Sequence, residues 1–104
     1  MYARVTLVEL DPMRMSVAGA VTRFRETVIP ELEKQAGYEG AYALATPEGK
    51  AMVITFWSSR EMAEANIASG YYESQIAKFG TVFRSPPGRE LYDVVIADTP
   101  VGVR

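Results

Sequence analysis

Apolar and β-branched residues gather in four segments of the chain, each long enough to form a strand. These segments are residues 2–9, 38–46, 51–57 and 91–97. Pro47-Glu48-Gly49 separates the second segment from the third, and so short a turn predicts an antiparallel hairpin. The pattern therefore predicts four strands, two of them joined directly.

A helical pattern lies between the first two strands. Ser16 is the predicted N-cap, because its hydroxyl can accept a hydrogen bond from a free backbone N–H. Apolar residues then recur at helical spacing and form one stripe, made of Val17, Val21, Phe24 and Val28. Arg23 and Arg25 fall mainly on the other side. Pro30 predicts the end of this helix and the start of a short segment that Gly37 terminates.

A second helical pattern follows Trp57. Ser59 and Glu61 form a helix-start signature, and the predicted helix runs to about Ser69, before Gly70. Three of its residues are expected to face the sheet, with Asn66 beside them: Met62, Ala65 and either Ala68 or Ser69. Residues 71–79 predict a further short helix, residues 80–88 a loop, and residues 98–104 an irregular arm.

The order of these elements is strand, helix, strand, strand, helix, strand. This order is typical of the α+β class and of the ferredoxin-like βαββαβ fold, which has an antiparallel sheet with both helices on one face. The 104 residues suffice for one domain, so we expect a single domain over residues 1–104 with its core in residues 2–97.

The strands are apolar on both faces, although a sheet covered by helices on one side should alternate apolar and polar residues. In the third strand one face carries Ala51, Val53, Thr55 and Trp57, and the other carries Met52, Ile54 and Phe56. The last strand repeats this with Leu91, Val95 and Ala97 opposite Tyr92, Val94 and Ile96. A second copy is the simplest cover for such a surface, so the sequence predicts a homodimer packed sheet to sheet.

Composition narrows the chemistry. The net charge of −2 provides no basic field for nucleic acid. The chain has neither histidine nor cysteine, so the commonest metal ligands, the usual haem ligand and the usual general base are missing, and we expect no metal site. The first residues predict a strand and not a signal peptide, and no apolar run could span a bilayer. We therefore expect a cytoplasmic protein without membrane contact.

Two motifs resemble the antibiotic biosynthesis monooxygenase-like family of dimeric α/β barrels. One is Val28-Ile29-Pro30-Glu31-Leu32 followed by Gly37-Tyr38-Glu39-Gly40, and the other is Phe56-Trp57-Ser58-Ser59-Arg60-Glu61. The order of elements over residues 2–97 resembles the family as well. The resemblance implies a dimeric α/β barrel with a cavity between sheet and helices in each subunit.

The family contains two activities that can be compared with this chain. Haem-degrading members use a histidine ligand, an asparagine near the first strand and a tryptophan on the second helix. This chain has no histidine, and its only asparagine, Asn66, lies on the second helix, whereas its only tryptophan, Trp57, lies at a strand end. The other activity is cofactor-independent oxygenation of aromatic phenols to quinones, in which the deprotonated substrate supplies the electrons. The resemblance thus implies a cofactor-free monooxygenase, an oxidoreductase, acting on an aromatic or polyketide-like small molecule.

Several residues are candidates for the site. Asn66 could hydrogen-bond a phenolate or carbonyl, and Asn66 and Tyr72 are the candidate catalytic residues. The candidate substrate-binding residues are Trp57, Asn66, Tyr71, Tyr72, Arg84 and Tyr42. Each has a plainer interpretation: Trp57 as core, the tyrosines as interface residues, and Arg84 as a solvated loop cation. Arg4, inside the first strand, is expected to pair with a carboxylate such as Glu9, Glu39 or Asp93.

Two other functions remain open from the sequence. One is a non-catalytic small-molecule-binding or structural dimer, whose interior is filled by Trp57, Met62, Phe79 and Phe83. The other is an isomerase or decarboxylase on the same scaffold, in which tyrosine or asparagine holds an enolate. A cavity of roughly 300 Å³ or more between helices and sheet would favour small-molecule chemistry over the filled interior.

Overall fold

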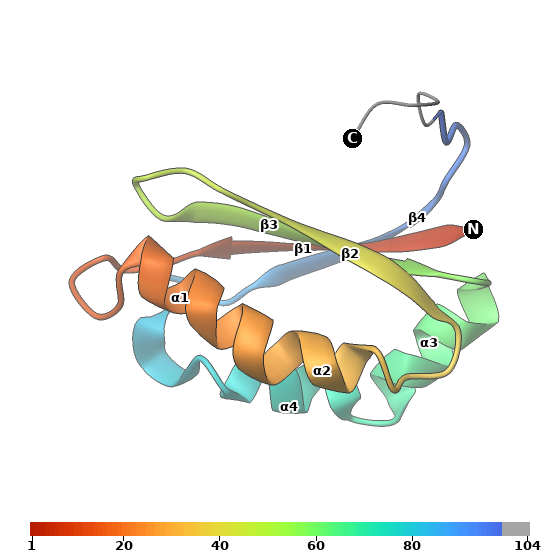
Figure 1. Ribbon diagram of the computed structural model, residues 1–104, viewed down its shortest axis with the longest axis horizontal. Helices are drawn as coiled ribbons and strands as arrows, with labels where there is room; N and C mark the ends of the chain where they lie inside the picture. Colours follow the sequence, from red (N-terminus) through yellow and green to blue (C-terminus); the bar gives the residue numbers. More distant parts are fainter. Residues whose placement is uncertain (99–104) are drawn as a thin grey trace.

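The computed structural model describes residues 1–98, apart from the side chain of Thr81, and contains the α+β ferredoxin-like fold (Figure 1). Four antiparallel strands form one sheet in the order β2-β3-β1-β4. Their bounds are β1 (Tyr2–Glu9), β2 (Tyr38–Ala45), β3 (Lys50–Trp57) and β4 (Gly88–Asp93). The expected arm over residues 98–104 lies outside the described residues except for Asp98, so the single domain over 1–104 stays a prediction.

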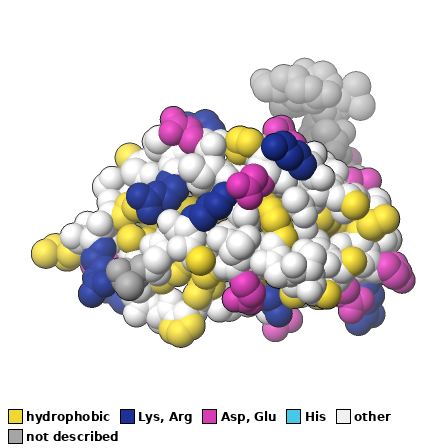
Figure 2. Space-filling model, turned by 90° about the horizontal axis from the view of Figure 1, so that it is seen from below, with side chains coloured by type: hydrophobic (Ala, Val, Ile, Leu, Met, Phe, Trp, Pro, Cys, Tyr) yellow, Lys and Arg dark blue, Asp and Glu magenta, His cyan; other side chains and the backbone are white. Residues whose placement is uncertain are grey.

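The helices cover one face of the sheet (Figure 1). They are α1 (Val17–Arg23), the π-helical turn η1 (Phe24–Val28), α2 (Ile29–Leu32), α3 (Arg60–Ala68) and α4 (Tyr71–Ala77), followed by a 3₁₀ turn η2 (Gly80–Val82). Seen from the helix side, basic and acidic side chains are interspersed (Figure 2). Both N-caps are confirmed, because Ser16 Oγ accepts from Gly19 N at 3.0 Å and Ser59 Oγ from Met62 N at 3.2 Å.

Pro30 does not end the first helix, contrary to the prediction. The backbone N–H of Ile29 donates to Phe24 O, five residues back, which makes the wide π turn of η1. An α-helix would direct the carbonyl of Glu26 at the proline ring and would need the N–H that Pro30 lacks. The π turn resets the hydrogen-bond register so that Pro30 falls at the start of α2, and the helical path continues to Leu32.

The last strand is Gly88–Asp93, not 91–97 as the sequence predicts. β4 pairs only with β1 among the described strands, and the pairing runs from Leu7↔Gly88 to Tyr2↔Asp93. β1 begins at Tyr2, so one further bond, from Val94 N to Met1 O at 3.2 Å, ends the ladder. A strand continues only as far as its neighbour supplies partners, and β1 therefore limits β4.

The sheet face turned away from the helices is apolar, as expected. Residues paired across antiparallel strands share a face, and Ile54 pairs with Val5 on one side and with Tyr42 on the other. We call this surface the open face; its members are Ala3, Val5, Leu7, Tyr42, Leu44, Met52, Ile54, Phe56 and Tyr92. Tyr42 is 68% exposed and Leu7 50%, so residues 1–98 leave large side chains of the open face uncovered, although Ala3 is buried.

The core lies at one end of the helix-covered face. Its fully buried centre is Trp57, whose ring meets Tyr38 edge to face at 5.9 Å and whose Nε1 donates to Thr55 Oγ1 at 2.9 Å. Tyr2, Val28, Leu32 and Ala63 complete this cluster. The plainer interpretation of Trp57 as a core residue agrees with this position.

Gly37 joins α2 to β2 and gives a stability prediction. Its φ is +82°, and an added Cβ would lie 2.6 Å from Met62 Cβ, an atom held by the α3 backbone. We expect Gly37→Ala to lower the free energy of unfolding by at least about 1–2 kcal/mol, from backbone strain alone. Urea denaturation would measure this. Gly88→Ala is the control, since Gly88 has open space around it, and equal midpoints for the two variants would contradict the prediction.

Candidate functional site

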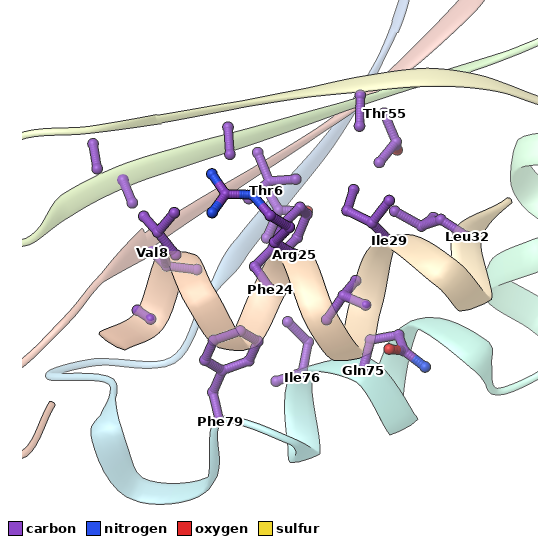
Figure 3. Close-up of a pocket in the computed structure, with 18 of the residues that line it drawn as sticks. Thr6, Val8, Phe24, Arg25, Ile29, Leu32, Thr55, Gln75, Ile76 and Phe79 are labelled. Carbon is purple, nitrogen blue, oxygen red and sulfur yellow. The ribbon is translucent and has the colours of Figure 1, made fainter. Parts of the chain in front are cut away.

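A cavity of about 440 Å³ lies between the helices and the sheet (Figure 3). This volume is in the range of small-molecule sites. Apolar side chains of both layers form most of its wall, among them Val8, Val53, Phe24, Ile29, Ile76 and Phe79. The interior is therefore hollow. Phe79 and Phe83, which would fill it if the protein were a purely structural dimer, instead stack on each other at the wall with ring centroids 5.7 Å apart.

Small side chains on the sheet create the space. The β2 and β3 residues that line it include Ala41, Ala43, Ala45 and Ala51. Alternate residues of a strand share a face, so three alanines in β2 leave a shallow surface under α1 and η1. The alternation of alanines in β2 is a sequence signal that could have located the cavity.

Arg4 is the buried charged group of the cavity wall. Its side chain leaves β1 toward the helices and is only 4% exposed. Arg4 Nη1 donates to Asn66 Oδ1 at 2.8 Å, and the guanidinium lies 4.9 Å from the Trp57 ring centroid and 5.1 Å from that of Tyr72. Burial lowers the pKa of Arg4 to about 10, so it remains a cation at neutral pH.

The expected carboxylate partner of Arg4 is absent. Within residues 1–98 no ion pair joins Arg4 to Glu9, Glu39, Asp93 or any other acid. The prediction failed because Arg4 projects into the cavity, where no acidic side chain is part of the described wall. The result is a desolvated cation held by an amide and two aromatic rings, with further N–H donors available to a ligand.

Asn66 lies behind Arg4 and outside the cavity wall. Its carbonyl accepts from Arg4, and its Nδ2 donates to Gln35 Oε1 at 2.9 Å. The buried positions of α3 are Ala63 and Asn66. The predicted set, which was Met62, Ala65 and either Ala68 or Ser69, is wrong. Ala63 is fully buried, so the side of α3 that carries Ala63 and Asn66 faces the core. Met62 packs beside Gly37.

Two polar atoms of α4 are buried without a hydrogen-bond partner in the described part of the chain. They are the hydroxyl of Tyr71 and Oε1 of Gln75, which belong to residues on the cavity wall. Residues four apart on a helix share a face. The Gln75 amide is held in place because Nε2 donates to Glu31 Oε2 at 2.9 Å. A buried polar atom without a partner is costly, so this pair marks a place where a bound molecule would be stabilised.

The ionisation of the groups around Tyr71 defines what it can do. Burial, together with the nearby charge of Glu31, raises the pKa of Tyr71 to about 12. Hydrogen bonds from Lys78 and Gln75 lower the pKa of Glu31, which stays ionised. Tyr71 is therefore a hydrogen-bond donor throughout the neutral range and not a base.

Tyr72 contacts two cations. The guanidinium of Arg4 lies 5.1 Å from its ring centroid, and that of Arg89 lies 4.7 Å from it. It lines both the cavity and a smaller hollow beside Pro87 and Arg89. Tyr72 therefore forms part of the wall between the two spaces.

Of the six candidate binding residues, Tyr71 and Tyr72 line the cavity. Trp57 and Asn66 lie behind Arg4, in contact with it. Tyr42 is on the open face against Phe56, and Arg84 is exposed after η2, where its backbone N–H donates to Glu9 O at 2.6 Å. Neither Tyr42 nor Arg84 belongs to the described wall of the cavity.

Sequence reasoning missed the charged and amide side chains of the wall, which are Arg4, Arg25 and Gln75. Arg4 could have been placed on the helix-covered face because it alternates with Thr6 and Val8 along β1, and alternate residues of a strand share a face. Arg25 was placed on the opposite side of the first helix, but it belongs to η1, whose wide turn departs from α-helical spacing. Figure 3 shows its guanidinium between the helix and the sheet.

Residues 1–98 contain no cluster of three acidic side chains that could hold a metal ion. No helix in this part of the chain is long and apolar enough to cross a membrane. The cytoplasmic location stays a prediction.

Solved structures share this fold. A monooxygenase from Streptomyces coelicolor, in complex with nanaomycin D, is 17% identical with a TM-score of 0.71, over 95% of this chain and 91% of the other. A cofactor-independent oxygenase from Streptomyces nogalater is 11% identical with a TM-score of 0.73, over 92% and 94%. A protein named antibiotic biosynthesis monooxygenase is 13% identical with a TM-score of 0.70, over 92% and 100%.

No family model and no curated protein matched the sequence. The structural likeness covers nearly the whole chain, and it confirms the resemblance found in the sequence at the level of the fold. The chain thus has the fold of the antibiotic biosynthesis monooxygenase-like proteins. What it does depends on its own cavity, because this fold hosts unrelated functions.

Removal of the unpartnered hydroxyl of Tyr71 is expected to increase stability and to weaken ligand binding. We expect Tyr71→Phe to raise the free energy of unfolding of the empty protein, by up to about 1–3 kcal/mol, because a buried group without a partner is removed. The same change should weaken binding of a phenolic ligand. Urea denaturation with and without anthrone would measure both, and Tyr2→Phe is a control at a buried tyrosine outside the cavity wall. A Tyr71→Phe protein that is less stable and binds anthrone equally well would contradict the prediction.

Proposed function

We propose that this chain is a cofactor-independent monooxygenase that oxidises an aromatic or polyketide-like phenol. The observation that carries the proposal is the buried Arg4 cation, which lines an apolar cavity without an acidic partner in the described residues. Such a cation stabilises an anion that is shielded from water. A phenolate or enolate is the electron donor that oxygenation without a cofactor requires.

The reaction can be written with an anthrone as substrate. Loss of a proton from its enol tautomer leaves an anion with high electron density at the reacting carbon. This carbon bonds to dioxygen and forms a peroxide, whose O–O bond then breaks as the carbon loses its remaining hydrogen as a proton. The CH₂ group becomes C=O and the second oxygen atom leaves as water, so the carbon loses four electrons and dioxygen gains four.

The residues of the wall have separate parts in this proposal. Arg4 binds the developing oxyanion and lowers the pKa of the substrate. Tyr71, protonated across the neutral range, donates a hydrogen bond to a substrate or peroxide oxygen. Oε1 of Gln75 accepts a hydrogen bond from a substrate hydroxyl. The apolar remainder of the wall excludes water from the anion.

The two candidate catalytic residues have different positions, one on the cavity wall and one behind Arg4. Tyr72 would contact the substrate directly, because it lines the cavity and its ring lies against Arg4. Asn66 would act as a positioning residue, since its carbonyl holds the Arg4 guanidinium. Trp57 also contacts this cation, with its ring centroid 4.9 Å from the guanidinium.

The comparisons support the proposal through the names of two relatives in fold. One is named a cofactor-independent oxygenase, and the other a monooxygenase solved with nanaomycin D. At 11–17% identity these names describe those proteins, and the fold is what the chain shares with them.

We also propose that the protein is a homodimer packed through its open faces. Large apolar side chains are half exposed or more there, including Leu7, Tyr42, Leu44 and Tyr92. Burial of one such side chain contributes roughly 1.5–3 kcal/mol. In a two-fold contact the same residues of both subunits are buried, so each contributes once from each subunit. A sheet-to-sheet dimer leaves both cavities, on the opposite faces, free for substrate.

Oxygen consumption with an anthrone tests the enzyme. We expect uptake of one dioxygen per anthraquinone formed, unchanged by a chelator. Uptake that stops with chelator and returns with metal would contradict the cofactor-free mechanism. Binding of anthrone without uptake would instead support the non-catalytic binding protein, and isomerisation or loss of CO₂ from a keto-acid analogue would support the other alternative.

A further inference from the structure

The cavity contains a second cation, Arg25, at a distance along the chain from Arg4. The side chain comes from η1, and Figure 3 shows its guanidinium in the space between the helix and the sheet, on the side of Thr6 and Val8. Arg25 forms no hydrogen bond or ion pair with any group of residues 1–98. It is exposed, whereas Arg4 is buried, so Arg25 is a solvent-accessible cation of the same wall.

The charges of the wall all have one sign. Arg4 and Arg25 are its only charged side chains among the described lining residues, although the chain as a whole has a net charge of −2. A surface cation without an acidic neighbour is ordinary, but this one faces an apolar cavity where an ion pair is screened less than in water. Guanidinium groups bind carboxylates through two parallel N–H···O bonds.

We propose that the substrate carries a carboxylate in addition to its phenol, and that Arg25 binds this carboxylate while Arg4 binds the phenolate. This proposal rests on the function proposed above and adds the substrate class. Arg25 is then a specificity-determining residue that selects acidic aromatic molecules over neutral ones. It does not take part in the transfer of oxygen, which occurs at the ring carbon opposite the one whose oxygen Arg4 binds.

Two quinones that differ in one group test the selection without turnover. The probes are anthraquinone-2-carboxylate and anthraquinone-2-carboxamide, and their dissociation constants are measured by equilibrium dialysis with the full-length protein. We expect the wild type to bind the carboxylate about 10-fold more tightly, since charge-assisted hydrogen bonds are roughly twice as strong as neutral ones. This preference should shrink as salt is added, because one partner is exposed to solvent.

Variants of Arg25 locate the source of the preference. Arg25→Gln should bring the two dissociation constants together by weakening only the carboxylate complex. Arg25→Lys should retain part of the preference, because the charge remains and the paired N–H geometry is lost. Arg60→Gln is the matched control; Arg60 is an exposed arginine on α3 that pairs with Glu64 at 3.3 Å, and its loss should change nothing.

The outcomes separate this proposal from the function it builds on. If the wild type consumes oxygen with anthrone but binds both quinones equally, the carboxylate proposal is wrong and the monooxygenase stands. If the preference survives in Arg25→Gln, Arg25 is not its source and the proposal is likewise overturned. If neither quinone binds and no oxygen is consumed, both proposals fall together.

Discussion

Arg4→Met is expected to lower kcat/KM for anthrone oxidation by about 10²–10³, the loss typical of removing one donor to a developing oxyanion. Arg4 is the only buried cation on the described wall, and its pKa of about 10 keeps it charged under assay conditions. Methionine has a similar length and fills the same apolar surroundings. Oxygen uptake at several substrate concentrations would measure the change.

Folding of the Arg4→Met protein can be checked independently. A buried charge without an acidic partner is expensive, so its replacement by an apolar residue of similar size should leave the melting temperature equal or higher. Arg89→Met is the matched control, because Arg89 also contacts the Tyr72 ring and is not on the cavity wall. Full activity in a stable Arg4→Met protein would refute the role assigned to the cation.

Asn66→Asp tests the role of the Arg4 guanidinium without removing it. The aspartate would place a carboxylate where Oδ1 now accepts from Arg4 at 2.8 Å. Arg4 would stay charged and oriented, but part of its field would be neutralised by the new partner. Turnover should fall and its pH profile should shift to higher pH, since the substrate would ionise less readily. A residue that only supported the fold would not move the pH profile.

Ile54→Glu is expected to convert the homodimer into a monomer at micromolar concentration. Ile54 lies near the middle of the open face, paired with Val5 and with Tyr42. In a two-fold contact the substitution appears in both subunits, so two carboxylates would be placed in an apolar interface. Removing such charges from water costs several kcal/mol per ion, which exceeds the gain from neighbouring apolar contacts. Size-exclusion chromatography with light scattering would measure the mass.

The control for this change is Met13→Glu, which introduces the same charge at a residue 92% exposed in the loop between β1 and α1. We expect it to remain dimeric. A wild-type mass near 11.5 kDa, that of one chain, would refute the dimer itself. A dimer that persists in Ile54→Glu would show that the subunits meet through another surface.

Local patterns predicted most of the fold. Ser16 and Ser59 marked helix starts because capping is a contact between residues three apart, and Gly37 and Gly70 marked helix ends because both adopt positive φ. The end of β4 escaped prediction because it depends on where β1 begins. The passage through Pro30 escaped it because a π turn needs a tertiary context that holds the wider helix.

The site was harder to predict than the fold. Tyr71 and Tyr72 were found as candidates because aromatic hydroxyls after a helix break are suited to a cavity wall. Arg4 was assigned to a carboxylate, since a buried cation usually has one. Nothing local to β1 indicates that its neighbour across 62 positions is the amide of Asn66.

The sequence by itself determined the class of fold, the apolar character of both sheet faces, and the lack of the commonest metal ligands, because periodicity and composition are properties of the chain alone. The tertiary structure alone decided that Arg4 and Arg25 line one cavity. It also decided that Asn66 supports the inner cation and that two atoms of α4 are buried without partners. Those relations depend on distances between β1, η1, α3 and α4, which arise only when the helices pack on the sheet.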